Sequence, residues 1–331
     1  MLFVDNQGVN DPRLNLAFEE YLLRHVDCLE PLLLFYVNEP SVIIGRNQNT
    51  IEEIDPDYVA ARQIHVVRRL SGGGAVYHDL GNLNFSFVTN GRDDLHNFAI
   101  FTEPVVAALR SLGVSAELRG RSDIFADGRK ISGNAQYATT GRMFSHGTLL
   151  FDTDLAEMLR AINPRRMEIE SKAVQSVRSV VANIRELLPG DMASEFNLDD
   201  LKDTLLRGIF GDGSIPTLAL TPADWERIEE IAAARYNQWD WNYGRSPRFN
   251  VRKTVRFPIG KVDAQIDVED GQIRAIRLFG DFNGRESVTA LETHLKGVPY
   301  DKEQLTAALQ DVNLNSFFGQ MDATTFIDLL Y

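Results

Sequence analysis

The segment that most constrains this chain is rich in glycine and has charged flanks. Residues 68–82 read RRLSGGGAVYHDLGN, between an apolar, β-branched run at 64–67 and a strand-like run at 83–89. Consecutive glycines are costly to order, so a chain keeps them where its backbone must approach another group closely. Because Arg69 stands beside the loop, we expect that group to be an anion, a phosphate or a carboxylate. The competing interpretation is a tight turn or bulge in a hairpin.

The composition is typical of a soluble globular chain of one large or two ordinary domains. It has 331 residues, of which 44% are hydrophobic and 24% are charged. No apolar stretch approaches the roughly 18 residues of a membrane span, and the N-terminus shows no signal-peptide pattern. A single cysteine, Cys28, excludes a disulfide framework. We therefore expect a cytoplasmic protein with no membrane partner, and nothing in the sequence requires more than a monomer.

Charge is distributed unevenly along the chain. The net charge of −13 argues against nucleic acid as a partner. Residues 62–147 nevertheless have a net positive charge, and this block contains the glycine loop. A basic pocket in an acidic protein suits a small anion better than a polyanion.

The first half of the chain alternates strands with helices. Asp11 and Pro12 open a helix as its cap and first residue. The remaining patterns predict strands at 32–37, 41–44, 64–69, 83–89 and 148–151, a helix at 103–112, and a hairpin over 124–131 that turns at Asp127 and Gly128.

The pattern changes after residue 151. It predicts helices at 154–162, 199–210 and 222–236, a break at 239–244, strands at 262–268 and 273–279, and helices at 291–295 and 302–309. The best domain boundary lies near 244–247. We therefore expect a large α/β domain over 1–244 and a small α+β domain over 245–331.

Further clusters carry side chains suited to chemistry. Lys130 follows the hairpin turn, and its compact charge suits holding a carboxylate and a phosphate together, although such a lysine is usually only solvated. His146 enters a strand and is as readily explained as a structural histidine. Asp123 suits either Mg²⁺ or an arginine partner. The segment 176–183 offers hydroxyls and Arg178 for closing over an anion, or is an ordinary helix start.

Several familiar sites are absent from the sequence. The glycine loop lacks both the Gly-Lys-Ser/Thr of a Walker A motif and the GxGxxG spacing of a dinucleotide fold. There is no Ser-His-Asp nucleophile elbow and no metal-ligand spacing. Cys28 is distant along the chain from every cluster, at the end of an amphipathic helix, and we expect it to be a buried filler.

Taken in order, these segments resemble the lipoate–protein ligase family of the biotin/lipoate ligase superfamily. The resemblance is carried by residues 68–82, 122–123, 128–135, 144–151, 172–184 and 239–247. It implies a biotin/lipoate-ligase-like catalytic domain over 1–244, with a mixed β-sheet flanked by helices. It also implies a small α+β accessory domain over 245–331.

The resemblance implies an ATP-dependent, adenylate-forming ligase. Lipoate and ATP, with Mg²⁺, would give lipoyl-adenylate and pyrophosphate, and the lipoyl group would then pass to a lysine of a lipoyl domain. The implied carriers are the E2 subunits of 2-oxo-acid dehydrogenase complexes and the glycine-cleavage H protein. Octanoate is a related acyl substrate.

The resemblance also assigns a site, in which Lys130 would contact both the lipoyl carboxyl and the adenylate phosphate. The implied ATP and adenylate site comprises Arg69, Gly74, Ala75, Val76, Tyr77, Asn82, Asp123, Lys130, Arg178 and Ser179, with Asp123 as the candidate Mg²⁺ ligand. The implied lipoate site comprises Ser71, Gly72, Gly73, His78, Lys130, Ser132, Gly133, His146 and Thr148. The dithiolane ring needs an apolar slot, which Val76, Tyr77, Phe85 and Phe87 could partly supply.

One position departs from the family pattern, and other functions stay open. The family's loop usually reads Ser-Val-Arg-Ser-Arg-Val, whereas Val180 stands at its fifth position here. This removes a positive charge from the segment expected to close over the adenylate. One alternative is an ATP-independent octanoyl- or lipoyl-transferase, some of which use a cysteine nucleophile. Others are a biotin ligase and a non-catalytic ligand- or carrier-binding homologue.

Overall fold

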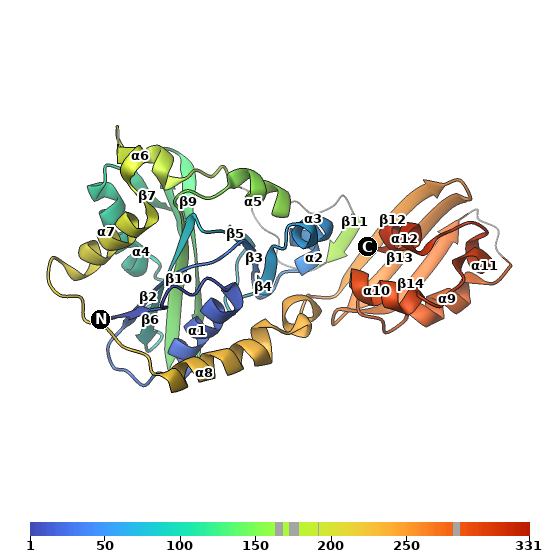
Figure 1. The fold of residues 1–331 in the computed structure, drawn as a ribbon, viewed down its shortest axis with the longest axis horizontal. Helices are drawn as coiled ribbons and strands as arrows, with labels where there is room; N and C mark the ends of the chain where they lie inside the picture. The colour runs from blue at the N-terminus through green and yellow to red at the C-terminus, as the bar shows by residue number, and fades with distance from the viewer. Residues whose placement is uncertain (163–167, 172–178, 191, 281–284) are drawn as a thin grey trace. The chain divides into compact units, whose positions relative to one another are not determined.

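A computed structural model describes residues 1–162, 168–171, 179–190, 192–280 and 285–331. The chain divides into two compact units (Figure 1). The first comprises Met1–Arg46, Asp55–Asn163 and Ser176–Gln238, and the second comprises Asn47–Ile54, Pro164–Gln175 and Trp239–Tyr331. Among the described residues, none of the helices combines the length and the apolar character needed to cross a membrane.

The first unit is built on a mixed, seven-stranded sheet. Its strands, in spatial order, are β1 (Leu2–Asp5), β2 (Leu32–Val37), β6 (Asn82–Asn90), β10 (Arg142–Leu150), β9 (Arg129–Ala138), β8 (Asp123–Ala126) and β7 (Ala116–Arg119). Strands β1 and β2 are parallel, and the other neighbours are antiparallel. The expected mixed sheet is confirmed.

A smaller sheet in the same unit contains the residues that flank the glycine loop. Its spatial order is β4 (His65–Arg68), β3 (Ser41–Ile44) and β5 (Val76–His78). Strand β3 runs parallel to β4 and antiparallel to β5. The glycine loop therefore connects the two outer strands of this sheet.

Five helices of the first unit begin at a residue whose side chain caps the first turn. The helices of this unit are α1 (Pro12–Arg24), α3 (Pro56–Ala61), α4 (Ala99–Ser111), α5 (Leu155–Ala161), α6 (Met192–Glu195), α7 (Leu198–Phe210) and α8 (Pro222–Ile231), with the 3-10 helix η1 (Ile184–Leu187) and the π-helical turn η2 (Ala232–Tyr236). As predicted, the Asp11 carboxylate accepts a hydrogen bond from a backbone N–H in the first turn of α1, and Pro12 begins the helix.

The two faces of the large sheet differ in character because β6 alternates strictly. Leu83, Phe85 and Phe87 point into the hydrophobic core that α4 and α7 complete. The intervening Asn82, Asn84 and Ser86 are all buried, with at most 1% of each exposed. Figure 1 shows α4 and α7 on one side of the sheet and α1 on the other. A fully buried polar face is unusual, because buried polar groups need partners.

The second unit is an antiparallel sheet covered by helices. Its strands are β11 (Glu168–Ser171), β12 (Phe249–Phe257), β13 (Gly260–Glu269) and β14 (Gln272–Gly280), and its helices are α2 (Thr50–Glu53), α9 (Val288–Leu295), α10 (Lys302–Leu309), α11 (Leu314–Phe318) and α12 (Ala323–Leu330), with the π-helical turn η3 (Asp240–Gly244). Strand β13 supplies four residues to its core, at 262, 264, 266 and 268, in the period of two expected for a half-buried strand. A small α+β unit was expected here.

Some local predictions were wrong. The expected break at 239–244 contains the helical turn η3, and the predicted helix over 222–236 changes to π-helical geometry after Ile231. The strand expected at 148–151 is the end of the longer strand β10. The predicted hairpin ended at residue 131, but its second strand β9 continues to Ala138 because β10 pairs with residues 134–138.

Candidate functional site

The buried polar face of the large sheet carries three of the predicted site residues, Asn82, His146 and Thr148. In the register of β10 with β6, His146 lies opposite Ser86 and Thr148 lies opposite Asn84. Strand β9 places Ala135 beside His146. Residues paired across adjacent strands project to the same face, so His146 and Thr148 continue the polar face that begins on β6.

The glycine loop is held in shape by Arg69. This side chain is only 5% exposed, and its Nη2 donates to the carbonyl oxygens of Gly72 at 2.6 Å and Gly74 at 2.8 Å. Its Nε donates to Ser71 Oγ at 3.0 Å, and its Nη1 donates to a carbonyl of β3 at 3.0 Å. Gly73 adopts a φ of +92°, which favours glycine, and a Cβ there would lie 3.1 Å from Arg69 Nη2. Arg69 thus spends four of its five N–H groups on the protein itself.

Burial does not remove the charge of Arg69. Its enclosed position lowers the pKa of the guanidinium to about 10, which leaves it protonated at neutral pH. The same burial raises the pKa of Tyr36 well above its ordinary value, with the Glu19 carboxylate adding to the effect. The loop therefore stands above a positive charge that is fixed in place.

A chain of hydrogen bonds joins the glycine loop to β10 and α1. Ser71 Oγ lies 2.8 Å from His146 Nε2, and His146 Nδ1 lies 2.9 and 3.1 Å from the two carboxylate oxygens of Glu19. All three residues are at most 8% exposed. The order resembles a serine–histidine–glutamate triad, but Arg69 donates to the same serine oxygen and so opposes its use as a nucleophile. The chain is suited to positioning the loop.

Sequence reasoning missed Glu19, although the sequence carries a signal. Glu19 and Glu20 are consecutive in α1, and both are at most 3% exposed. Glutamate is seldom buried without a partner, and each has one: Glu19 pairs with His146, and Glu20 pairs with Arg24 and Arg235. Two adjacent acids between the apolar runs 16–18 and 21–23 of α1 therefore mark a buried polar site.

Lys130 lies on the hairpin formed by β8 and β9, and it has a single anionic partner among the described residues. Its Nζ is 2.9 Å from Asp123 Oδ2, and the two side chains are 24% and 31% exposed. A Cβ on Gly133 would lie 3.3 Å from Lys130 Nζ, so the glycine leaves space beside the ammonium. The Gly133 N–H donates to Thr148 Oγ1 at 3.4 Å. The structure brings these four predicted residues together.

The base of this hairpin is tightly fixed. Asn134 Nδ2 donates to the Ser122 carbonyl at 2.6 Å and to Ser132 Oγ at 3.2 Å. A Cβ on Gly147 would lie 2.0 Å from Asn134 Oδ1, so no larger residue fits there without movement. The predicted residue Ser132 is 1% exposed and takes part in this hydrogen-bonded arrangement.

The chain after residue 178 runs alongside Lys130. The Lys130 N–H donates to the Val180 carbonyl at 2.8 Å, and the Ala182 N–H donates to the Lys130 carbonyl at 3.1 Å. Ser179 is exposed, and the Val180 side chain is 73% exposed. Arg178 lies outside the described residues. The backbone of the segment expected to close over an adenylate is therefore anchored at Lys130.

The remaining predicted residues lie on β5 and at the start of β6. Gly74 and Ala75 lead into β5, where Val76 is half-buried and Tyr77 is buried. Asn82 is fully buried and donates to Asn84 Oδ1 at 3.0 Å. Strand β10 is the common scaffold, since it contacts the glycine loop through His146 and the lysine hairpin through Thr148.

Two expectations about apolar and sulfur groups were wrong. Phe85 and Phe87 cannot line a slot on the polar face, because they point into the core on the other side of the sheet. Cys28 is not a buried filler: it is only partly buried, and it lies beyond the end of α1.

No preformed metal centre was found in the described part of the chain, where no three His, Cys, Asp or Glu side chains are grouped to hold an ion. Asp123, the candidate Mg²⁺ ligand, is paired with Lys130. Mg²⁺ commonly binds through one or two carboxylates together with substrate phosphates, so a lone carboxylate fits an ion that arrives with a nucleotide.

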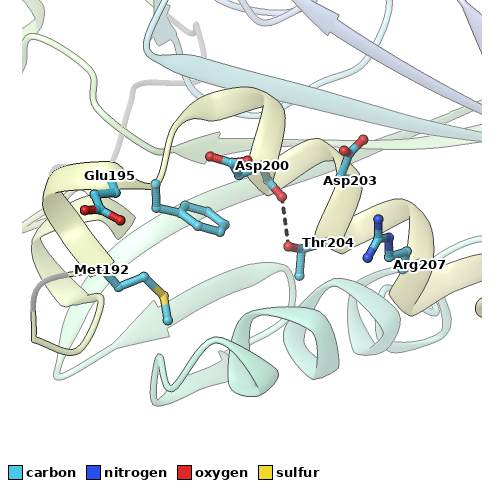
Figure 2. A pocket seen from close by; sticks show the side chains of 7 residues that line it. Met192, Glu195, Asp200, Asp203, Thr204 and Arg207 are labelled. Carbon is cyan, nitrogen blue, oxygen red and sulfur yellow. Dashed lines mark hydrogen bonds between the residues drawn. The ribbon is translucent and has the colours of Figure 1, made fainter.

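A separate concavity lies on α6 and α7 (Figure 2). It is lined by Met192, Glu195, Phe196, Asp200, Asp203, Thr204 and Arg207. Figure 2 shows the Thr204 hydroxyl bonded to the Asp200 carbonyl within α7. It contains none of the predicted site residues, and three carboxylates around one guanidinium do not suit an anionic ligand.

Two family models match the chain. The lipoyl protein ligase A/B catalytic domain matches residues 11–210, and the bacterial lipoate protein ligase C-terminus matches residues 246–330. Lipoate-protein ligase LplJ of Bacillus subtilis is 52% identical over all of both chains. Lipoate–protein ligase 1 of Staphylococcus aureus is 46% identical, again over all of both chains.

Solved structures of lipoate ligases also match this chain. A lipoate protein ligase of Thermoplasma acidophilum with bound lipoic acid is 30% identical, with a TM-score of 0.60, over 73% of this chain and 98% of that one. A lipoate-protein ligase A bound with ATP is also 30% identical, with a TM-score of 0.60, over 74% and 97% of the two chains.

Proposed function

This chain belongs to the lipoate–protein ligase family, and on that premise we propose that it activates lipoate with ATP at Lys130 and passes the lipoyl group to a lysine of a lipoyl domain. The observation that carries the proposal is the state of Lys130. Its ammonium is part exposed, pairs with one carboxylate among the described residues, and stands beside the space that Gly133 leaves open.

In the first step, a lipoate carboxylate oxygen attacks the α-phosphorus of ATP. The bond from that phosphorus to the bridging oxygen breaks, and pyrophosphate leaves with its electron pair. Two anions must be pressed together, so a fixed cation at the reacting centre lowers the barrier. Lys130 supplies that cation when its ammonium exchanges the Asp123 carboxylate for oxygens of the substrates.

The glycine loop would form the opposite wall. Nothing lies within 4 Å of where a Cβ on Gly72 would stand, so the backbone there is open to a ligand. Arg69 is assigned to the shape and positive potential of this wall, because most of its donors are already used by the loop. The backbone N–H groups of Gly72–Ala75 would then approach phosphate or carboxylate oxygens.

Mg²⁺ would enter as part of the nucleotide substrate, with Asp123 as the protein carboxylate placed to reach it. The ion would neutralise charge on the leaving pyrophosphate. The segment 176–183, with Arg178 and Ser179, would contact the adenylate, and the backbone of its described residues Val180 and Ala182 bonds to that of Lys130.

In the second step, the amine of a carrier lysine attacks the acyl carbon, the bond to the phosphate oxygen breaks, and AMP leaves. This step depends mainly on position. We propose E2 lipoyl domains and the glycine-cleavage H protein as carriers. An archaeal bipartite lipoate protein ligase studied with its E2 lipoyl domain, 28% identical over 74% of this chain, supports the first of these. We further propose a cytoplasmic monomer with a catalytic domain at 1–244 and an accessory domain at 245–331.

An ATP-independent acyltransferase that uses a cysteine nucleophile is disfavoured. Cys28 is the only cysteine, and its thiol donates a hydrogen bond to Glu30, with 3.4 Å between Sγ and Oε2. Glu30 and Cys28 are not among the residues that the site brings together. An acyl-enzyme route would therefore need another nucleophile.

The proposal is tested by weighing the carrier after reaction. Full-length protein, an apo lipoyl domain, ATP and Mg²⁺ are incubated with lipoate, octanoate or biotin, and the carrier is analysed by mass spectrometry. We expect the mass of one lipoyl group with lipoate, only when ATP is present. Transfer without ATP would support the acyltransferase, a biotin adduct would support a biotin ligase, and an unchanged carrier would support a binding protein.

A further inference from the structure

Four buried side chains form a hydrogen-bonded chain that ends at His78. Asn6 Nδ2 lies 3.0 Å from Asn15 Oδ1, Asn15 Nδ2 lies 2.9 Å from Asn38 Oδ1, and Asn38 Nδ2 lies 2.9 Å from His78 Nδ1. These residues are 7%, 1%, 0% and 3% exposed. Three buried amides in series are costly unless each is satisfied, and each donates in the same direction, toward the histidine.

The backbone fixes the direction of this chain. Asn15 Nδ2 also faces the carbonyl oxygens of Val9 at 2.9 Å and Val37 at 3.3 Å. Carbonyl oxygens only accept, so the amide of Asn15 cannot be turned over. The atom of Asn38 that faces Asn15 must then be its oxygen, and the atom that faces His78 must be its nitrogen.

The direction of the chain sets the protonation state of His78. A nitrogen that faces a donor must accept, so Nδ1 carries no proton. Burial first, and then the electrostatic effects of the Arg69 guanidinium and the His146 ring, lower the pKa of His78 to about 3. The ring is therefore neutral, with its one proton on Nε2. That atom is buried and has no hydrogen-bond partner within the described residues.

The unpartnered N–H belongs to the site. His78 ends β5, the strand that the glycine loop feeds, and it lies opposite Ser41 on β3. Ser41 Oγ is also buried with no partner among the described residues. A buried donor without an acceptor is destabilising. This cost is explained if a substrate supplies the acceptor.

We propose that Asn38 is a positioning residue that holds His78 as a neutral Nε2–H donor, and that this N–H donates to an anionic oxygen of a bound substrate. The oxygen belongs to the lipoate carboxylate or to a phosphate of ATP. The inference rests on the proposed function for its substrates. A neutral donor can bind such an oxygen without adding a second buried charge beside Arg69.

The first test measures the protonation state of the His78 ring by NMR, in the full-length protein labelled with ¹⁵N-histidine. The His78 signal is identified by its absence in His78→Gln. We expect ring nitrogen shifts of a neutral imidazole with the proton on Nε2 at neutral pH. Lipoate alone or ATP alone should then shift that proton. An Nδ1–H tautomer or an imidazolium would overturn the proposal, as would a signal that neither substrate moves.

The second test uses Asn38→Asp to reverse the direction of the hydrogen bond at His78. The substitution keeps the shape of the side chain at position 38 but places a carboxylate oxygen against Nδ1 of His78. Asn15 can still donate to the new side chain. We expect the proton to move to Nδ1, and the KM of one substrate to rise about tenfold or more, with kcat changed much less. The KM that rises identifies the source of the oxygen. Unchanged KM values after a confirmed tautomer switch, or a loss confined to kcat, would contradict the proposal.

Two substitutions of the histidine separate donation from packing. His78→Gln keeps an N–H near the position of Nε2, and His78→Leu removes it. Only the leucine variant should reproduce the KM of Asn38→Asp, and equal KM values for both would contradict the role of the N–H. The NMR state of His78 is measured without turnover, so a wild-type chain that makes no lipoyl-adenylate would refute the proposed function without deciding this one.

Discussion

The glycine loop and the Lys130 hairpin each present a cation, but they use it differently. Arg69 is 5% exposed and donates to three groups of its own loop. Lys130 is 24% exposed and pairs with one carboxylate in the part of the chain that the structure describes. An arginine suits the first role because its planar fork meets several acceptors at once, whereas a lysine is a compact charge that changes partners easily. Arg69 stabilises the shape of the glycine loop, whereas Lys130 is available to bind substrates.

The largest effect is expected from Arg69→Met. Two loop carbonyls and the Ser71 hydroxyl would lose their donor, at a cost of about 2–4 kcal/mol in the free energy of unfolding, and the misshapen loop would lose activity as well. Chemical denaturation measures the cost. Lys130→Met is the matched control, and its unfolding free energy should change by less than about 1 kcal/mol because the pair is partly solvated. An equal loss of unfolding free energy in the two variants would contradict the different roles given to Arg69 and Lys130.

Acid should lower the free energy of unfolding through His78, which lies on the strand that follows the glycine loop. The pKa of His78 is lowered to about 3 in the folded chain, and it is about 6.5 when the chain is unfolded. Below pH 6.5 the unfolded chain therefore binds a proton that the folded chain does not, so stability falls as the pH falls. Between pH 7.5 and pH 5 the loss from this group is about 2 kcal/mol at most.

His78→Gln should make the unfolding free energy less dependent on pH over that range, as measured by denaturation at each pH. An unchanged slope in this variant would show that other groups cause the acid sensitivity.

A smaller effect is expected from Val180→Arg on the hairpin side. The side chain of Val180 is 73% exposed, while its carbonyl accepts from Lys130. The substitution leaves that backbone bond intact and adds a charge near the expected adenylate. We expect lipoyl-adenylate to dissociate a few-fold more slowly, with unfolding changed by less than about 0.5 kcal/mol. An unchanged dissociation rate would mean that position 180 does not contact the adenylate.

The smallest effect is expected from Cys28→Ser, because Cys28 belongs to neither the glycine loop nor the Lys130 hairpin. Its thiol is only partly buried and is bonded to Glu30. Carrier lipoylation should keep the wild-type rate. An inactive but folded variant would restore the cysteine-dependent acyltransferase as the leading hypothesis.

The sequence predicted what local patterns determine. Asp127 and Gly128 form the turn of the lysine hairpin, with φ of +48° and +75°, as expected of such a pair. The alternation of β6 was also visible, and the core side of that strand follows from it. Lys130 is therefore placed correctly by spacing alone.

What the sequence did not predict depends on contacts between distant segments. Arg69 was expected to face a ligand, yet its guanidinium is turned toward its own loop, and no local pattern distinguishes these two directions. Glu19 meets His146 across 127 positions, and the asparagines that orient His78 come from three separate segments. The packing of α1 against the strands, together with the sheet registers, brings such residues together.

The most direct test of the division of roles is one round of adenylation by Lys130→Ala. Excess enzyme is mixed with lipoate, labelled ATP and Mg²⁺ without a carrier, and lipoyl-adenylate is measured over time beside a thermal melt. We predict that the rate falls by at least about 100-fold, while the melting temperature stays within about 2 °C of wild type. Wild-type rates of adenylate formation in the variant would contradict the assignment of Lys130 to the reacting centre.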